Sequence, residues 1–173
     1  MGAAAGGGAA ARPVTADDYF AIQALVFRYA ACVDRADYPA LGRLFAHADI
    51  WVWGRLSCRS DPEAAARQWR DSVRRYSDGT PRTRHVVTNL VIEPDGPDRA
   101  IAESYVMVFQ QTDALALQPI IGGDYFDRFA KVDGAWRFTE RRLGNDLFGD
   151  LRAHLLDPGA RPAPGQALAR PRG

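Results

Sequence analysis

The chain has 173 residues, of which 47% are hydrophobic and 25% charged, a balance that indicates one globular domain with its own core. Lysine and arginine number 22 against 21 acidic residues, so the formal charge is +1 and the basic excess of a nucleic-acid-binding domain is missing. No stretch approaches the ~20 apolar residues that a membrane span needs, and the Ala/Gly-rich start does not resemble a signal peptide. We therefore expect a cytoplasmic protein that binds neither nucleic acid nor membrane.

Both ends of the chain have biased compositions. Residues 1–13 are mainly glycine and alanine, and residues 157–173 are rich in proline, glycine, alanine and arginine. Neither segment can bury enough apolar surface to offset its ordering entropy, so we expect two disordered tails around a domain at 14–156. The two cysteines, Cys32 and Cys58, form no CxxC motif, and reduced thiols are the expected state.

Three helices are predicted in the first half of the domain. Thr15 and Asp18 resemble a capping box, so a helix should begin there and present one apolar face. Asp37 can cap a short second helix, and Asp61 followed by a proline can start a third. The apolar face of the first helix would consist of Ile22, Leu25, Val26, Tyr29 and Val33.

The second half of the domain reads as strands. The expected strands there are 85–93, 100–110, 124–132 and 136–142, with turns at 94–98 and 133–134. A further short strand is expected earlier, at 50–53, between the second and third helices. A last helical segment is expected over 146–155, because Leu147, Leu151 and Leu155 recur at helical spacing. Helices followed by consecutive antiparallel strands predict an α+β fold in which the helices cover one face of the sheet.

A histidine inside an apolar, β-branched strand is the first sign of chemistry. This residue is His85. Histidine side chains in general have an unperturbed pKa of ~6.5, which makes histidine a suitable proton acceptor near neutral pH. Tyr29 and Asp34 lie at the end of the first helix. A carboxylate can hold an imidazole in one tautomer, and a tyrosine hydroxyl can donate to a substrate oxygen. Together the three residues would make an acid–base site that needs no cofactor and no metal.

Structural interpretations of the same residues remain open at this stage. A lone histidine in a strand is more often a hydrogen-bonded structural residue, and Tyr29 could belong to the core. Asp34 could merely begin the turn that follows the helix. Strand alternation places Asn89 on the same face as His85.

Several segments of the chain resemble the SnoaL-like branch of the nuclear transport factor 2-like superfamily. The resemblance spans about 14–156, and its order and spacing are more specific than any single segment. The segments that carry it are Arg28-Tyr29-Ala30 with Val33-Asp34-Arg35, Leu44-Phe45-Ala46, Arg84-His85-Val86-Val87-Thr88-Asn89, Gly123-Asp124-Tyr125-Phe126-Asp127-Arg128-Phe129, and Asp133-Gly134-Ala135-Trp136-Arg137-Phe138.

This resemblance implies a cone-shaped α+β barrel, in which a curved, mostly antiparallel sheet wraps around the N-terminal helices and encloses one deep pocket. It implies a proton-transfer dyad at His85 and Asp34, with Tyr29 orienting a substrate oxygen. One of Arg141 and Arg142 should face the pocket. The substrate-binding residues expected from the resemblance and from the aromatic content are Asn89, Trp51, Trp53, Ser104, Tyr125 and Arg141.

The middle strand departs from the pattern of the steroid isomerases in the superfamily. Its inward positions are Ala102, Ser104 and Val106, with no carboxylate, so steroid-isomerase chemistry is not expected. The resemblance implies instead a dehydratase, isomerase or cyclase acting on a small hydrophobic cyclic or polyketide-like compound. A non-catalytic binding or scaffold protein, or a structural β-type subunit of a ring-hydroxylating dioxygenase, are the alternatives. A homodimer or homotrimer is expected, paired through the outer sheet face that carries Tyr105 and Met107.

Overall fold

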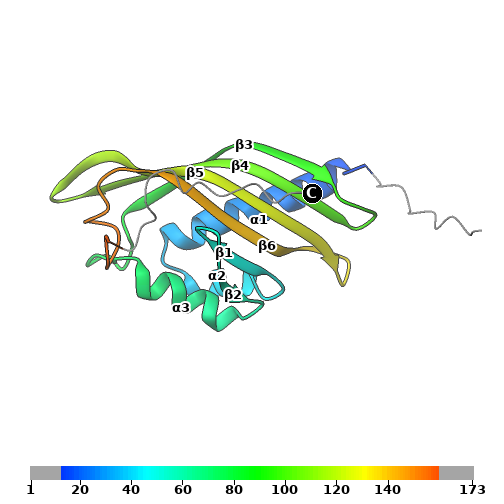
Figure 1. Ribbon diagram of the computed structural model, residues 1–173, viewed down its shortest axis with the longest axis horizontal. Helices are drawn as coiled ribbons and strands as arrows, with labels where there is room; N and C mark the ends of the chain where they lie inside the picture. Colours follow the sequence, from blue (N-terminus) through cyan, green and yellow to red (C-terminus); the bar gives the residue numbers. More distant parts are fainter. Residues whose placement is uncertain (1–12, 160–173) are drawn as a thin grey trace, which may run out of the picture.

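The computed structural model describes residues 13–159, so nearly all of the two expected tails lies outside the described part of the chain. Three helices precede most of the sheet, as the α+β prediction requires (Figure 1). The elements are α1 (Ala16–Asp34), α2 (Tyr38–Leu44), β1 (Asp49–Val52), β2 (Arg55–Arg59), α3 (Pro62–Ser72), β3 (Thr83–Pro94), β4 (Arg99–Thr112), β5 (Leu115–Val132) and β6 (Ala135–Phe148).

The predicted capping residues begin all three helices. Thr15 and Asp18 exchange side-chain and backbone hydrogen bonds in a complete capping box at the start of α1. Asp18 also accepts a hydrogen bond from the indole of Trp136 at 2.9 Å, which ties the start of the helix to β6. The carboxylates of Asp37 and Asp61 accept backbone N–H groups at the starts of α2 and α3.

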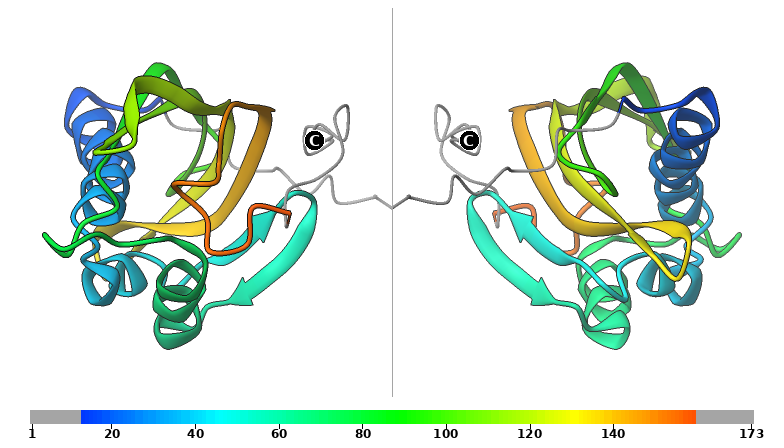
Figure 2. Two further views of the ribbon diagram at one scale, coloured as in Figure 1. Left: turned by 90° about the vertical axis from the view of Figure 1, so that its left-hand side faces the viewer. Right: turned by 90° about the vertical axis from the view of Figure 1, so that its right-hand side faces the viewer.

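Six strands form one sheet in the order β2-β1-β6-β5-β4-β3, and every pairing is antiparallel except that of β1 with β6. The sheet curves around the helices without closing, which confirms the expected cone-shaped α+β architecture (Figure 2). The side chains of β4 alternate as predicted between its two faces. Its concave, buried set comprises Ala102, Ser104, Val106, Val108 and Gln110.

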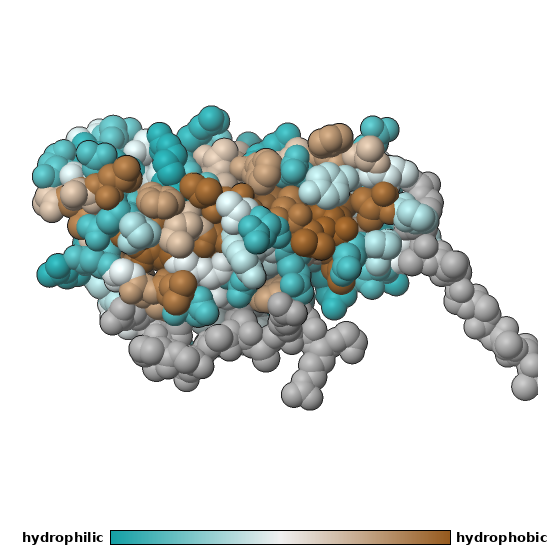
Figure 3. Space-filling view, turned by 90° about the horizontal axis from the view of Figure 1, so that it is seen from above, coloured by the Kyte–Doolittle hydropathy of each residue, from teal (hydrophilic) through white to brown (hydrophobic). Residues whose placement is uncertain are grey.

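The convex face of the sheet carries exposed apolar side chains from several strands. Figure 3, which looks onto this face, shows the apolar residues gathered across it. Val86, Tyr105 and Leu147 are among its large exposed hydrophobic residues. None of the described helices is both long enough and apolar enough to span a membrane.

The helix expected at 146–155 is wrong. Strand β6 continues to Phe148, which pairs with Ile121 of β5, and the chain then folds back without a regular element. Leu147 is exposed on the convex face whereas Leu151 is buried, so the spacing of the leucines does not correspond to one helical stripe. The strands β5 and β6 are also longer than predicted, and β2 was not predicted at all.

The segment after β6 is held inside the curve of the sheet. Leu155 forms an isolated bridge with Val73, just after α3, and the carbonyl of His154 accepts the backbone N–H of Arg74 at 2.8 Å. Figure 2 shows this segment folding back toward the concave side of the sheet. It therefore supplies a wall to the interior instead of covering the outer face.

Candidate active site

Asp34 and His85 meet where the end of α1 packs on the start of β3. The Nδ1 atom of His85 lies 2.7 Å from Oδ1 of Asp34, and the backbone N–H of His85 donates to Oδ2 at 2.9 Å. The hydroxyl of Thr83 donates to Oδ1 at 2.8 Å. Three hydrogen bonds from one strand therefore orient a carboxylate that belongs to a helix.

These contacts determine the protonation pattern of the pair. Burial would raise the pKa of Asp34, but the hydrogen bonds and charge of His85 and the Thr83 hydroxyl outweigh it, so the pKa of Asp34 is lowered. The ionised carboxylate accepts a hydrogen bond from Nδ1, which must therefore carry the proton. In the neutral imidazole the free lone pair is then on Nε2. A base therefore becomes available on the side of the ring away from Asp34.

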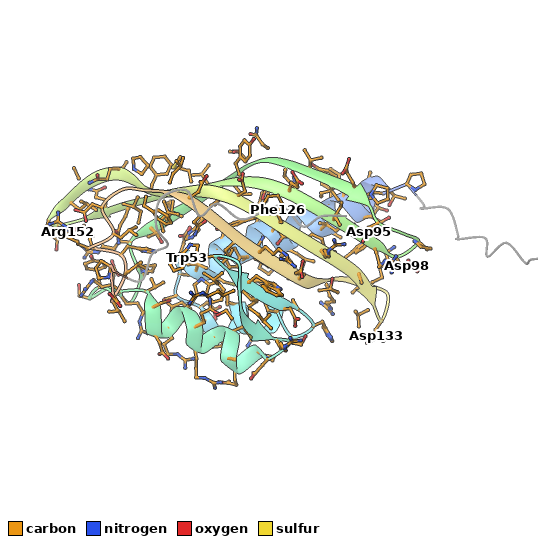
Figure 4. The ribbon with its side chains drawn as sticks, viewed as in Figure 1. Trp53, Asp95, Asp98, Phe126, Asp133 and Arg152 are labelled. Carbon is orange, nitrogen blue, oxygen red and sulfur yellow. The ribbon has the colours of Figure 1, made fainter. Side chains whose placement is uncertain are left out.

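His85 lines a cavity of about 530 Å³ that also borders Tyr29, Trp53 and Tyr125. This size is in the range of small-molecule sites. In Figure 4, Asp95, Asp98 and Asp133 mark the hairpin turns at one end of the sheet, and Arg152 marks the other end. The segment after β6, which contains Arg152, contributes residues to the cavity wall. Most of the wall is apolar and includes Val33, Val108, Ile121, Leu143, Phe148, Leu151 and Leu155.

A buried ion pair supports the two tyrosines of the cavity. Arg141 donates two hydrogen bonds to the carboxylate of Asp127, one from Nε and one from Nη2, each at 2.7 Å. Arg141 is fully buried. The guanidinium lies 4.2 Å from the ring centre of Tyr29 and 4.6 Å from that of Tyr125. Burial raises the pKa of both phenols despite the positive charge of Arg141, so they remain protonated hydrogen-bond donors.

The other expected site residues take different positions. Trp53 and Tyr125 line the cavity, and Arg141 lies behind the tyrosines. Arg142 instead stacks on Trp51, 4.6 Å from its ring centre, and Trp51 is not part of the cavity wall. Ser104 is buried in the concave core without reaching the wall of the cavity.

Asn89 does not share the cavity with His85. The register of β3 against β4 shifts between Thr88 and Val91, and Asn89 has a φ of 53° within this bulge. The left-handed conformation, which asparagine tolerates better than most residues, interrupts the alternation of side chains. Asn89 is consequently exposed, and the expectation that it faces the pocket is wrong.

The SnoaL-like domain model matches residues 14–142, three quarters of the chain, which include Asp34, His85 and the two tyrosines of the cavity. The chain belongs to the SnoaL-like family. No curated protein matches its sequence.

Solved structures share the fold of this SnoaL-like protein. A Mycobacterium tuberculosis protein of unknown function is 29% identical, with a TM-score of 0.62 over 75% of this chain and 72% of that one. A candidate scytalone dehydratase from Novosphingobium aromaticivorans is 22% identical, with a TM-score of 0.63 over 85% and 96%. The β subunit of a candidate aromatic-ring-hydroxylating dioxygenase from the same organism is 19% identical, with a TM-score of 0.58 over 75% and 90%. The last two similarities establish the fold alone.

Sequence reasoning missed two polar residues in the wall of the SnoaL-like cavity. His154 is 4% exposed and reaches the cavity from the segment after β6, and Asn145 reaches it from the end of β6. Both carry a buried side-chain atom, Nδ1 and Oδ1 respectively, without a hydrogen-bond partner in the described structure. Asn145 lies immediately before the segment expected to be helical, and His154 lies within it, but no motif singled out either residue.

His154 should make the stability of this SnoaL-like protein depend on pH. Burial, helped by charge on His85 and opposed by Asp34, lowers the pKa of His154 from 6.5 to about 4. The unfolded chain therefore binds one more proton than the folded chain between these values, and stability is lost as the pH falls from about 6.5 to about 4. We expect a loss of about 3 kcal/mol across this window.

Urea unfolding at pH 7 and pH 4.5 measures this effect, with His154→Phe as the comparison. The variant should lose clearly less stability than the wild type over the same interval. Asp34, whose pKa is lowered, contributes stability that is lost only below its ordinary value of 3.8, outside this window. Equal pH dependence in both proteins would contradict the assignment of the loss to His154.

Proposed function

We propose that this protein is a cofactor-independent acid–base enzyme of the dehydratase, isomerase or cyclase type. Its substrate would be a small hydrophobic cyclic or polyketide-like compound. The observation that supports this most is the 2.7 Å contact between Asp34 and His85 at the wall of a largely apolar cavity. A histidine with a purely structural role would need no cavity beside it. Its second ring nitrogen, Nε2, would also need no access to a ligand.

The proposed reaction starts with proton abstraction. Neutral His85 takes a proton at Nε2 from the carbon next to a substrate carbonyl, and the electrons of the C–H bond form an enolate. The carboxylate of Asp34 stabilises the imidazolium that results. The protonated hydroxyl of Tyr29 donates to the enolate oxygen, where negative charge develops. A positioned base of this kind contributes ~10²–10⁴ in rate.

The fate of the proton distinguishes the three reaction types. In a dehydration the enolate expels a β-hydroxyl group, and the imidazolium returns its proton to that group, which leaves as water. In an isomerisation the proton returns to a different carbon. In a cyclisation the enolate carbon attacks a second carbonyl carbon of the same molecule, the π electrons of that carbonyl move to its oxygen, and the imidazolium gives its proton to this oxygen. All three use the same dyad and the same hydrogen-bond donor.

The fold is also compatible with non-catalytic proteins. The similarity to a dioxygenase β subunit concerns the fold, and a binding or scaffold protein could have the same sheet and helices. The buried carboxylate–imidazole pair favours the enzyme, because a scaffold has no need to hold one histidine tautomer beside a cavity.

The tautomer of His85 can be tested without a known substrate. In ¹⁵N-labelled protein we expect Nδ1 of His85 to carry the proton and Nε2 to be unprotonated. Asp34→Asn should abolish this preference, and the exposed His47 should be unchanged as an internal reference. If the ratio of the two His85 tautomers is the same in the wild type and in Asp34→Asn, the dyad is excluded.

Activity can be tested by incubating the full chain with neutral cyclic β-hydroxyketones in D₂O. NMR detects deuterium uptake next to the carbonyl and the formation of the unsaturated product. His85→Gln is the matched control, because it keeps a polar side chain of similar length and removes the base. If no compound reacts faster with the wild type than with this variant, the binding-protein alternative is preferred.

We also propose that two or three copies of the chain pair through the convex sheet face. Its exposed side chains, including Tyr105 and Leu147, would lose contact with water on pairing. Sedimentation velocity of the full chain measures the state directly, and Tyr105→Arg should shift it toward the monomer. A wild-type protein that is monomeric at all concentrations would contradict the proposal.

A further inference from the structure

The cavity contains polar groups that the proposed proton transfer does not use. Tyr29 and His85 serve the reacting end, while His154 enters the same cavity from the segment after β6. This segment is held by hydrogen bonds of its backbone, including those from Arg74 to the carbonyl of His154 and from Tyr76 to the carbonyl of Ala153 at 2.6 Å. His154 is therefore positioned through its backbone, and its ring is not needed to anchor the segment.

The ring of His154 has the features of an unoccupied binding group. Its side chain is more than nine-tenths buried, and Nδ1 has no hydrogen-bond partner in the described structure. Burial keeps the pKa of His154 near 4, so the ring is neutral at neutral pH and offers one donor and one acceptor. A buried nitrogen without a partner is unfavourable for stability, so a ligand atom that bonds to it would remove this cost.

The charges around the cavity define the type of ligand. Among the described residues that line it, the acidic ones are Asp71 and Asp157, and none is lysine or arginine. A carboxylate or phosphate group would find no lysine or arginine among these residues to offset its desolvation, and the two exposed aspartates carry the same sign of charge. The wall between the polar groups is apolar. A neutral ligand with a hydrophobic body and oxygen atoms at its ends is complementary to this arrangement.

We propose that His154 forms a second polar subsite, which binds a hydroxyl or carbonyl oxygen of a neutral substrate at a position separate from the oxygen that faces Tyr29 and His85. The proposal extends the proposed function, because it restricts the substrate to uncharged ring compounds with at least two oxygen functions. His154 is then a specificity-determining residue, and it takes no part in the proton transfer.

Binding of small aromatic probes tests this subsite without turnover. The probes are 2-naphthol and four dihydroxynaphthalenes with hydroxyl groups at positions 1,3, 1,5, 2,6 and 2,7, which vary the separation of the two oxygens on one apolar body. Their dissociation constants are measured by calorimetry with the full chain. We expect at least one diol to bind about tenfold more tightly than 2-naphthol, the effect of one additional hydrogen bond in a buried site.

Two variants assign the gain to His154. His154→Phe keeps an aromatic ring without nitrogen and should abolish the gain, so that the best diol binds about as tightly as 2-naphthol. His154→Gln should retain part of the gain. 6-Hydroxy-2-naphthoate, which carries a carboxylate, should bind more weakly than the diols to all three proteins. Urea unfolding at neutral pH verifies that the phenylalanine variant is folded, and its stability should be at least that of the wild type.

The outcomes separate this inference from the proposed function. A full gain in His154→Phe, or no gain for any of the four diols with the wild type, would overturn the subsite. The tautomer of His85 is measured independently and does not depend on His154. If the gain depends on His154 while His85 shows no tautomer preference, the subsite is established in a binding protein instead of an enzyme.

Discussion

Asp34→Asn is expected to lower kcat by about 10³- to 10⁴-fold while leaving substrate binding nearly unchanged. The asparagine keeps the size of the side chain but removes the negative charge that orients Nδ1 of His85 and stabilises the imidazolium. Loss of the corresponding carboxylate in serine-protease triads has an effect of about 10⁴-fold through the wrong tautomer. The measurement is a comparison of kcat and KM for the compound that reacts in the β-hydroxyketone assay.

Thr83→Val is the matched control for this prediction. It removes the hydroxyl that donates to Asp34 at 2.8 Å but leaves the carboxylate and its bonds to His85 in place. We expect a decrease in kcat of about tenfold or less, because the ionised carboxylate loses one of its three hydrogen bonds and keeps the two to His85. A kcat for Asp34→Asn within tenfold of the wild type would show that Asp34 does not assist the base.

Asp127→Asn is expected to destabilise the protein by about 3–5 kcal/mol, because it leaves the fully buried guanidinium of Arg141 without a counter-ion. The guanidinium of Arg141 packs on the rings of Tyr29 and Tyr125. Loss of its counter-ion should therefore also disturb the two phenols that line the cavity. Urea unfolding at neutral pH measures the change in the free energy of unfolding.

The double variant Asp127→Leu with Arg141→Met separates the charge from the packing. Replacing both members of a buried ion pair by apolar residues of similar size is often neutral, so this protein should be much closer to the wild type than Asp127→Asn. If the double variant were as unstable as the single one, the packing of the two side chains would account for the loss. A change below 1 kcal/mol for Asp127→Asn would show that water reaches Arg141.

The two members of the dyad each carried a local signal in the sequence, and the resemblance to the SnoaL-like family is what paired them. His85 was unusual as a histidine in an apolar strand, and Asp34 closed a helix whose start was marked by a capping box. That their side chains come within 2.7 Å depends on the packing of α1 on β3, which brings together residues 51 positions apart. Their catalytic roles remain predictions.

Alternation along the last strand was also sufficient to predict that Arg141 and Arg142 face opposite sides. Their environments were not predictable, since the partners of Arg141 come from β5 and α1 and those of Arg142 from β1 and its own strand. Asn89 failed for a different reason. A bulge moved it to the surface, and a bulge is a property of two paired strands.

The sequence by itself determined the α+β class, the starts of the helices and most strands, because capping, turn chemistry and hydrophobic periodicity act between residues close in the chain. Only the tertiary structure decided the path of the segment after β6. Leucines four residues apart are typical of a helix, but the same spacing also occurs where each leucine packs against a different element. Here Leu147 is exposed on the convex face and Leu151 is buried. No local pattern marks His154. Its place in the cavity wall depends on backbone hydrogen bonds between its segment and the chain after α3, which are contacts between distant parts of the sequence.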